Sequence, residues 1–309
     1  MTRLLTVLAT ALPLLAATTP ASATAPGKPH VPAGVTAGYV VFDRQSAKVT
    51  EYRNAHRRFR SASVVKILIA IDRLESRSGV SKEDLALLKV MLRVSDDDAA
   101  TSFWSRGGQG RIIQRMARKL QLTDTTPPPA DKPGFWGYTS LSAMDVVKTY
   151  RYLLDRADPK VSGLILGHLR RAGQCGSDGF DQYFGIPRGV RGPWAVKQGW
   201  SGYGSTPPVR CRPATSPAAR TASAAFTSAS PAPAALGATA PSGGTTAAPA
   251  GAGPVPDLGR PVLHSTGLVG PGERWIMVLL TAHPAGATWQ RSTGQTTRLA
   301  REVHLSGTS

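Results

Sequence analysis

The sequence predicts an α/β (α+β) protein in which strands from both ends of the chain form one antiparallel sheet, flanked by helices, with a helical subdomain inserted between the strands. Two β-branched or aromatic segments, 38–43 and 48–53, predict a pair of strands joined by a short turn. A strongly apolar stretch at 63–77 predicts a buried central helix. Segments 262–269 and 274–281 predict a late hairpin. The 309 residues are enough for one large domain.

The remaining elements follow from local signals along the chain. Ser81 begins a Ser-Lys-Glu-Asp capping pattern ahead of apolar residues at helical spacing, which predicts that a helix starts there. Hydrophobic periodicity predicts further helices and one more strand. These are helices at 110–120, 142–154, 161–171 and 292–303, and a strand at 195–197.

The first 23 residues predict a cleavable signal peptide. Arg3 precedes an apolar run that ends in Ala21-Ser22-Ala23, a pattern that signal peptidases accept. The alternative is a membrane anchor, but the run is shorter than the roughly 20 residues that span a bilayer, and Pro13 interrupts it. No cysteine follows the run. We therefore expect a secreted, extracellular protein without a lipid anchor.

Composition divides the rest of the chain. Residues 24–35 are rich in Pro and Gly and predict a flexible lead-in. Residues 212–258 consist mainly of Ala, Pro, Ser, Thr and Gly, and such a segment buries too little apolar surface to offset the entropy of ordering it. We expect 212–258 to be a disordered insert in a single domain formed by 36–211 and 259–309.

Charge and cysteine content limit the partners. Lys+Arg number 37 and Asp+Glu 19, and the net charge of +18 favours a polyanion as partner. Export disfavours nucleic acid and leaves the anionic cell wall as the natural candidate.

Cys175 and Cys211 predict a disulfide in an exported chain. No Cys/His cluster has zinc-site spacing, so no metal or cofactor is predicted. A monomer is expected.

The first chemical motif is Ser63-Val64-Val65-Lys66, an S-x-x-K pattern. Ser63 opens the apolar helix, and Lys66 lies one turn later on the same face. Desolvation among apolar neighbours lowers the pKa of a lysine, which lets it act as a base for a serine. The alternative is a helix N-cap serine with a lysine whose ammonium reaches solvent.

Two further motifs follow in order, Ser95-Asp96-Asp97 and Lys197-Gln198-Gly199. With them the chain resembles the serine β-lactamase and penicillin-binding protein superfamily, class A β-lactamases in particular, whose motifs are S-x-x-K, S-D-N and K-T-G. The resemblance covers 37–211 and 262–305. G-x-S-x-G does not occur, which disfavours an ordinary α/β-hydrolase.

The resemblance implies acyl transfer from a β-lactam or a peptidoglycan stem peptide. Ser63 is then the nucleophile, Lys66 its proton acceptor, and Ser95 the group that passes a proton to the leaving nitrogen. Lys197 supplies positive charge near Ser95 and the substrate carboxylate. The backbone N–H groups of Ser63 and Trp200 form the oxyanion hole. The implied substrate contacts are Asp97, Gln198, Gly199 and Trp200.

Three departures from the motifs bear on this expectation. Asp97 replaces the Asn of S-D-N and is expected to pair with Lys66, which keeps that lysine charged and a poorer base. Gln198 replaces the Thr of K-T-G, with an amide that could still meet a carboxylate. No glutamate lies between Leu122 and Ser142, where class A enzymes carry their deacylating base. Asp131 is the candidate substitute, and a solvated loop aspartate is the alternative.

The leading hypothesis is therefore a secreted serine acyl-hydrolase that forms an acyl-enzyme on Ser63 and hydrolyses β-lactams slowly. A penicillin-binding, carboxypeptidase-like enzyme is one alternative. The other is a non-catalytic envelope-binding module with a degenerate site. His264 and His283 are expected to be buried polar residues rather than catalytic ones, and Trp136 and Tyr138 are candidate cleft residues.

Overall fold

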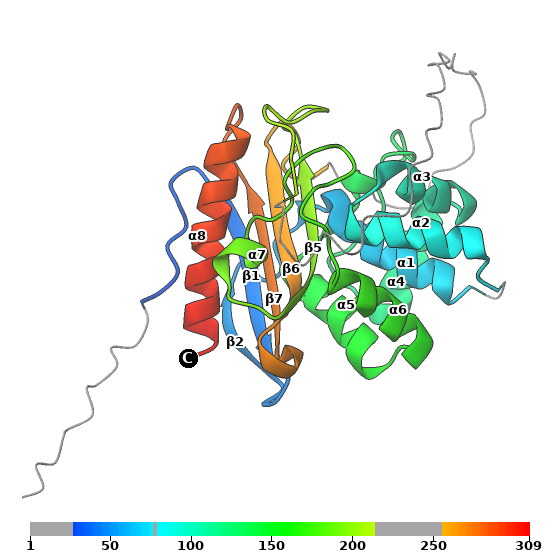
Figure 1. The fold of residues 1–309 in the computed structure, drawn as a ribbon, viewed down its shortest axis with the longest axis horizontal. Helices are drawn as coiled ribbons and strands as arrows, with labels where there is room; N and C mark the ends of the chain where they lie inside the picture. Colours follow the sequence, from blue (N-terminus) through cyan, green and yellow to red (C-terminus); the bar gives the residue numbers. More distant parts are fainter. Residues whose placement is uncertain (1–26, 77–78, 214–254) are drawn as a thin grey trace, which may run out of the picture.

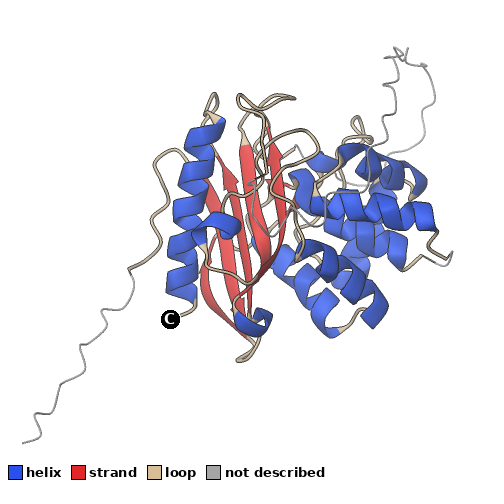
Figure 2. Ribbon diagram, viewed as in Figure 1, coloured by secondary structure: helices blue, strands red, loops and turns tan. Residues whose placement is uncertain are grey.

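The computed structural model describes residues 27–76, 79–213 and 255–309. Strands from both ends of the chain form a five-stranded antiparallel sheet in the order β2-β1-β7-β6-β5, with helices on both faces (Figures 1 and 2). The predicted α/β class and antiparallel sheet are confirmed. The strands are β1 (Thr36–Asp43), β2 (Lys48–Arg53), β5 (Trp194–Ser201), β6 (Val262–Val269) and β7 (Trp275–Ala282), and a separate small sheet pairs β3 (Phe59–Arg60) with β4 (Ser140–Leu141).

The helices between β3 and β5 lie mainly on one side of the sheet, and the C-terminal helix lies on the other (Figure 1). The α-helices are α1 (Lys66–Leu74), α2 (Lys82–Arg93), α3 (Asp97–Arg106), α4 (Gly110–Leu120), α5 (Ala143–Asp155), α6 (Pro159–Leu169), α7 (Ile186–Gly189) and α8 (Trp289–Gly307). Short 3₁₀ helices are η1 (Ala62–Val65), η2 (Trp136–Tyr138) and η4 (Pro271–Glu273).

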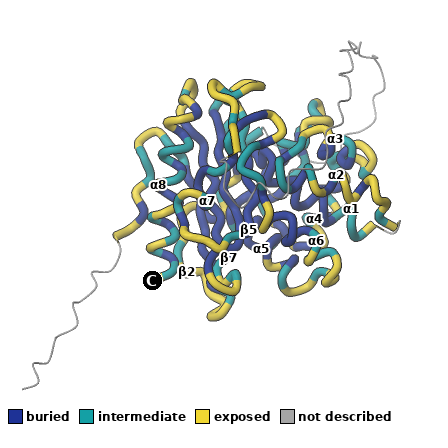
Figure 3. The backbone as a smooth tube through the Cα atoms, in the orientation of Figure 1, coloured by how far each residue is buried: buried dark blue, intermediate teal, exposed yellow. Residues whose placement is uncertain are grey.

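Side-chain alternation along β1 explains why the sheet is covered on both faces. Val40 and Phe42 point into the core shared with α1 and α5, whereas Tyr39 and Val41 point into the core shared with α8. β1, β5, β6 and β7 are buried along most of their length, whereas the edge strand β2 is mostly exposed (Figure 3). A strand that is apolar on both faces needs helices on both sides, which gives three layers.

Helix starts follow from capping side chains. The Ser81 side chain accepts from Asp84 N at the start of α2, as the capping pattern predicts. Ser142 caps α5 and Thr288 caps α8 in the same way, which places the start of α8 three residues before the predicted one. The sequence analysis did not predict α3, whose cap is Asp96 accepting from Ala99 N.

The central helix of the structure differs from the predicted helix at both of its ends. Its first turn is the 3₁₀ helix η1, and the α-helix proper begins at Lys66 and ends at Leu74 rather than at residue 77. Ala62, just before Ser63, has φ +43°, in the left-handed region that a residue with a Cβ seldom adopts. This turn sets the direction in which the chain enters α1.

Cys175 and Cys211 form the predicted disulfide, so that prediction is confirmed. The bond joins the loop after α6 to the segment after β5, and the Cys211 backbone N–H also donates to Gly179 O at 2.8 Å. The predicted disordered insert, 212–258, lies almost entirely outside the described residues, as do the predicted signal peptide and the first residues of the lead-in.

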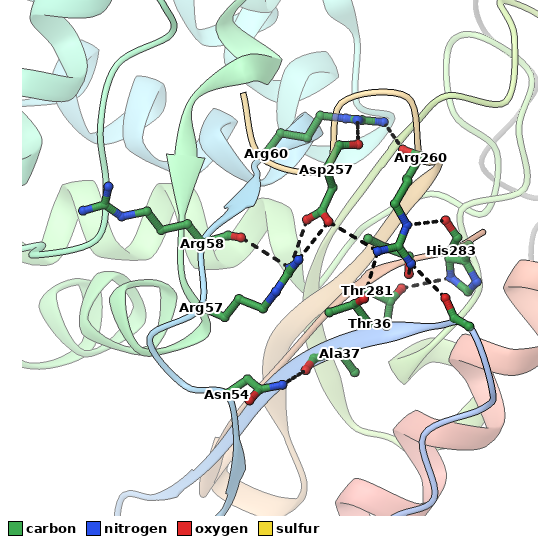
Figure 4. Close-up of polar contacts among 12 residues, drawn as sticks. Thr36, Ala37, Asn54, Arg57, Arg58, Arg60, Asp257, Arg260, Thr281 and His283 are labelled. Carbon is green, nitrogen blue, oxygen red and sulfur yellow. Dashed lines mark hydrogen bonds and ion pairs between the residues drawn. The ribbon is translucent and has the colours of Figure 1, made fainter. Parts of the chain in front are cut away.

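Arginines hold the segment that precedes β6 against the sheet (Figure 4). Arg57 donates to both carboxylate oxygens of Asp257, at 3.0 and 2.9 Å, and the Asp257 side chain is 4% exposed. Arg60 donates to the carbonyls of Asp257 and Arg260, each at 2.6 Å. A paired guanidinium and carboxylate can be buried at low net cost because each satisfies the other.

Within the described residues, no helix has the length and apolar character needed to cross a membrane.

Replacing Cys175 and Cys211 by Ser should lower the free energy of unfolding by about 4 kcal/mol, because a cross-link over 36 residues restricts the unfolded chain. Urea unfolding measures this difference. The neighbouring exposed Val209→Ala is the control and should change stability by less than about 0.5 kcal/mol. Equal stability of the double variant and the parent protein would contradict the role given to the bond.

Three histidines, His168, His264 and His283, are buried, and burial lowers the pKa of each from 6.5 to about 4. Between about pH 6.5 and 4 the unfolded chain binds protons that the folded protein does not, so stability should fall as the pH falls through that window, by roughly 2 kcal/mol per histidine. Urea unfolding at about pH 7 and pH 4.5 tests this. His283→Gln should flatten the pH dependence and exposed His30→Gln should not; a flat profile in the parent protein would refute it.

Candidate active site

Ser63 lies in η1 at the wall of a cavity of about 460 Å³. The left-handed Ala62 precedes it, and the Ser61 N–H donates to Thr139 O at 2.7 Å, which ties the turn to the small β3–β4 sheet. Ser63 itself is 6% exposed. Strained backbone held by surrounding packing is common where a reactive side chain must be positioned. The serine of the S-x-x-K motif is therefore buried yet borders open space.

Lys66, one turn later, is fully buried beneath the cavity. Its Nζ donates to Ser95 O at 2.6 Å, to Asp97 Oδ1 at 2.6 Å and to Ser95 Oγ at 3.3 Å, and it lies 4.6 Å from the centre of the Trp136 ring. The expected ion pair with Asp97 is present. Among the described residues, no hydrogen bond joins Lys66 Nζ to the Ser63 hydroxyl. Lys66 is engaged with Ser95 and Asp97 instead.

The second motif supplies Ser95, which lies between two lysines. Ser95 has φ +58°, and this left-handed residue turns the chain into α3, so that its hydroxyl and carbonyl both face Lys66. Lys197 Nζ, from β5, donates to the same hydroxyl at 2.8 Å and to Gln198 O at 3.0 Å. The structure thus brings Lys66, Ser95 and Lys197 together from separate parts of the chain.

Burial sets the charge state of the two lysines. Desolvation lowers the pKa of Lys66, and the adjacent Asp97 carboxylate opposes that shift. Burial lowers the pKa of Lys197 well below its usual value, and the nearby Lys66 charge lowers it further. An amine with a lowered pKa is present partly in the neutral form, and only that form accepts a proton. The arrangement can therefore move protons through the Ser95 hydroxyl.

Side-chain alternation along β5 separates Lys197 from its neighbour Gln198. Lys197 faces Ser95, whereas the Gln198 amide points to the other face and donates to the backbone carbonyls of Gln182 and Phe184, at 3.1 and 2.6 Å. Gln198 is not among the residues that line the cavity. Its expected contact with a substrate carboxylate is thus not supported by its position, because its donors are already used within the fold.

Gly199 and Trp200 bring the β5 strand against the serine turn. A β-carbon at Gly199 would lie 3.1 Å from the backbone nitrogen of Ser63 and 3.1 Å from Ser61 O, so any larger residue would push the two segments apart. Gly199 thus keeps the two expected oxyanion donors, the backbone N–H groups of Ser63 and Trp200, on adjacent segments. Trp200 also lines the cavity.

Asp131, the candidate deacylation base, lies away from the site. Its side chain is 73% exposed, its partner is Lys132 at 3.7 Å, and it does not line the cavity. The loop between α4 and α5 instead presents Trp136, which stacks on Lys66 and donates from Nε1 to Thr101 Oγ1 at 3.2 Å. The loop therefore contributes an aromatic ring next to Lys66 rather than a carboxylate.

The sequence analysis missed some residues of the cavity. It named Trp136 and Tyr138, which do line it, but not Thr101, Asp178 or Tyr203. Asp178 lies in the disulfide-bonded loop, where its carboxylate accepts from Trp200 Nε1 at 2.9 Å and from Phe180 N at 3.1 Å. No local pattern marks Asp178 in the sequence. The only available signal was that the predicted disulfide would hold this loop close to β5.

The sequence is similar to curated proteins over about half of its length. No protein-family model matches the sequence. Proteins named "Putative lipoprotein LppW" from Mycobacterium tuberculosis and Mycobacterium bovis are 37% identical over 175 residues, which is 54% of this chain and 54% of each relative. The chain thus spans about half the length of the curated relatives it matches.

These relatives correct the expected localisation. Their name points to a lipid-anchored envelope protein, so the prediction of a protein without a lipid anchor is wrong by this comparison. That prediction rested on the lack of a cysteine directly after the first apolar run, a local feature of residues outside the described part of the chain.

Solved structures share the architecture over most of the chain. PBP-A is similar with a TM-score of 0.56 at 14% identity, over 88% of this chain and 90% of PBP-A. The β-lactamase of Streptomyces albus G gives 0.56 at 15% identity, over 88% and 93%. A class A β-lactamase from Mycobacterium abscessus gives 0.55 at 16% identity, over 88% and 93%. The sheet, the helices and these likenesses lead to one conclusion: the chain has the fold of the serine β-lactamase and penicillin-binding protein superfamily.

Proposed function

We propose that this chain is a serine acyl-transfer protein that forms an acyl-enzyme on Ser63 with a β-lactam or a peptidoglycan stem peptide and releases it slowly. The observation that carries the proposal is the Ser95 hydroxyl, 2.8 Å from Lys197 Nζ and 3.3 Å from Lys66 Nζ, beneath the cavity that Ser63 borders. Two buried amines that are bonded to one hydroxyl can pass protons between them. A purely structural role would not require this arrangement.

The chemistry balances as follows. Ser63 Oγ bonds to the carbonyl carbon of the donor, and its proton passes to the neutral amine of Lys66. The C–N bond of the donor breaks, and the leaving nitrogen takes a proton from Ser95, which recovers one from a lysine. Lys66 Nζ must move from Asp97 toward Ser63 for the first transfer. The backbone N–H groups of Ser63 and Trp200 would stabilise the oxyanion.

Slow release follows from the surroundings of Lys66. Hydrolysis of an acyl-enzyme needs a base that activates water. The α4–α5 loop supplies Trp136 at Lys66, and Asp131 is exposed away from the cavity. One similar structure is an acyl-enzyme complex of a PBP-A variant with penicillin G, with a TM-score of 0.55 at 13% identity over 88% of this chain and 90% of that one. This likeness supports formation of an acyl-enzyme.

A non-catalytic envelope-binding module is the second candidate function. The observation that favours it is the ion pair of Lys66 with Asp97 at 2.6 Å, because the Asp97 carboxylate favours the charged form of the expected base. The net charge of +18 and the lipoprotein relatives support an envelope location under either candidate.

Incubation with a fluorescent penicillin should label the protein, and Ser63→Ala should abolish the labelling, because Ser63 lines the cavity and lies one turn before Lys66. Intact-protein mass spectrometry over time measures adduct formation and release. We expect a persistent adduct. Exposed Asp131→Asn is the control and should change neither rate.

Three outcomes would count against parts of this proposal. Labelling that survives Ser63→Ala would remove Ser63 as nucleophile. Absence of any adduct in protein shown to be folded would favour the binding-module candidate. Rapid turnover with no detectable adduct would refute slow release while leaving acyl transfer in place.

Asp97→Asn should speed acylation by roughly tenfold, since the Asp97 carboxylate raises the pKa of Lys66 and a shift of one pKa unit is worth a factor of ten. Asn keeps the shape of the side chain and an oxygen acceptor for Lys66. The acylation rate constant is measured with the same fluorescent penicillin. Asp98→Asn, which removes an exposed carboxylate from the same turn of α3, should leave the rate unchanged. An unaltered rate in Asp97→Asn would refute this account of Asp97.

A further inference from the structure

Two hollows adjoin on the face of the molecule formed by α7, α8 and the segment after β5. The larger, of about 880 Å³, is lined by Arg188 beside Arg210 and Arg212, and by the first half of α8. The smaller, of about 500 Å³, is lined by Arg188, Arg191 and Arg301. α7 packs against both α8 and β5 (Figure 1). Because Arg188 belongs to both hollows, they form one surface along α8.

This surface carries a strong positive charge. The described residues that line the two hollows include one acidic side chain, Asp181, and five arginines, all of them exposed. Five cations against one carboxylate leave a net charge of +4. We call these arginines the α7–α8 arginine surface; they are Arg188, Arg191, Arg210, Arg212 and Arg301.

Most of these arginines have no partner within the described chain. Arg188 donates to Asp181 Oδ2 at 2.7 Å. The side chains of the other four form no hydrogen bond or ion pair with another described residue. Residues 212–256 contain no Asp or Glu, so the segment that follows Cys211 cannot supply the missing counter-charge. The four guanidinium groups are therefore available to anions from outside the chain.

Two other large cavities of the described chain differ in charge. A cavity of about 640 Å³ between α1, α3 and α4 is lined by four basic residues, but each of them pairs with Asp72, Glu75 or Asp84. The described wall of the Ser63 cavity has two carboxylates and no Lys, Arg or His. Unpaired positive charge in a concave setting is thus a property of the α7–α8 arginine surface.

The shape of this surface favours a ligand that is a chain. From Trp289 in the larger hollow to Arg301 in the smaller, α8 rises by about 18 Å, so one small anion would reach only part of the surface. A bilayer is flat and would meet the rims of the hollows, whereas a chain can follow both. Each hollow also has an indole in its wall, Trp289 or Trp194, on which an apolar part of a repeat unit can pack.

We propose that the α7–α8 arginine surface binds an anionic polymer of the cell envelope, a chain that repeats phosphate or carboxylate groups. The planar guanidinium group matches the oxygens of both anions with two parallel hydrogen bonds. None of the five arginines lines the Ser63 cavity, so a bound polymer would leave that cavity open. The inference is independent of the acyl transfer proposed above, because it does not require a reactive Ser63.

Two fluorescein-labelled polymers test the proposal with the full chain, polyphosphate for repeated phosphates and polygalacturonate for repeated carboxylates. Labelled dextran is the uncharged control, and fluorescence anisotropy measures binding. We expect at least one anionic polymer to bind and dextran not to bind. The affinity should fall as the salt concentration rises from about 0.05 to 0.3 M, because salt screens exposed charges. A preference between the two polymers identifies the anion.

Paired substitutions locate the site. Arg191→Gln with Arg301→Gln removes charge from the smaller hollow, and Arg210→Gln with Arg212→Gln removes it from the larger. Each pair should weaken binding by about fivefold, because each exposed ion pair contributes modestly. The control pair, Arg111→Gln with Arg118→Gln, removes the same charge from exposed residues of α4 that line neither hollow, and should weaken binding by less than about twofold. Circular dichroism checks that each variant is folded.

Several results would overturn the inference. Failure of both anionic polymers to bind the parent protein would do so, and if vesicles of phosphatidylglycerol then bind, the surface belongs to a membrane. Equal weakening by the α4 pair would show general charge attraction in place of a site. Ser63→Ala should bind the polymers as the parent protein does, whereas loss of binding in this variant would place the polymer in the Ser63 cavity.

Discussion

The Ser95 hydroxyl, held between the amines of Lys66 and Lys197, is the contact on which the active-site arrangement depends. Lys66 begins α1, Ser95 precedes α3, and Lys197 lies in the middle of β5. The hydroxyl therefore joins the central helix, the helical part and the edge of the sheet at one point. Burying two amines is costly unless each is bonded, and here Ser95, Asp97 and the Gln198 carbonyl provide the acceptors.

Contacts between residues far apart in the sequence hold the segments on either side of the site. The Cys175–Cys211 disulfide fixes the loop that carries Asp178, and the arginines around Asp257 fix the segment that leads into β6. Gly199 lets β5 approach the Ser63 turn closely, since a β-carbon there would lie 3.1 Å from the Ser63 backbone nitrogen. Rigid supports of this kind keep a nucleophile and its partners aligned without the need for substrate to order them.

The proposed slow release rests on the surroundings of Lys66. An aromatic ring, Trp136, stacks on the lysine, and Asp97 pairs with the same lysine from α3. The first feature disfavours release of an acyl group, and the second disfavours its formation.

Short-range patterns in the sequence predicted most of the elements, though not α3, and the order of the motifs. β-Branched and aromatic residues predicted β1 and β2, the capping pattern at Ser81 predicted α2, and two cysteines in a chain expected to be exported predicted the disulfide. These features depend on residues a few positions apart or on simple counts.

Only the tertiary structure decided which side chains meet. In the folded chain, Lys66 donates to Ser95 and the Gln198 amide lies on the far face of β5. Asp131 is exposed to solvent, whereas Asp178 and Trp136 line the cavity. Local periodicity says that neighbouring side chains alternate, but not which face a distant loop will cover. That choice depends on packing between segments more than 30 residues apart, such as Lys66 and Asp97 with a separation of 31.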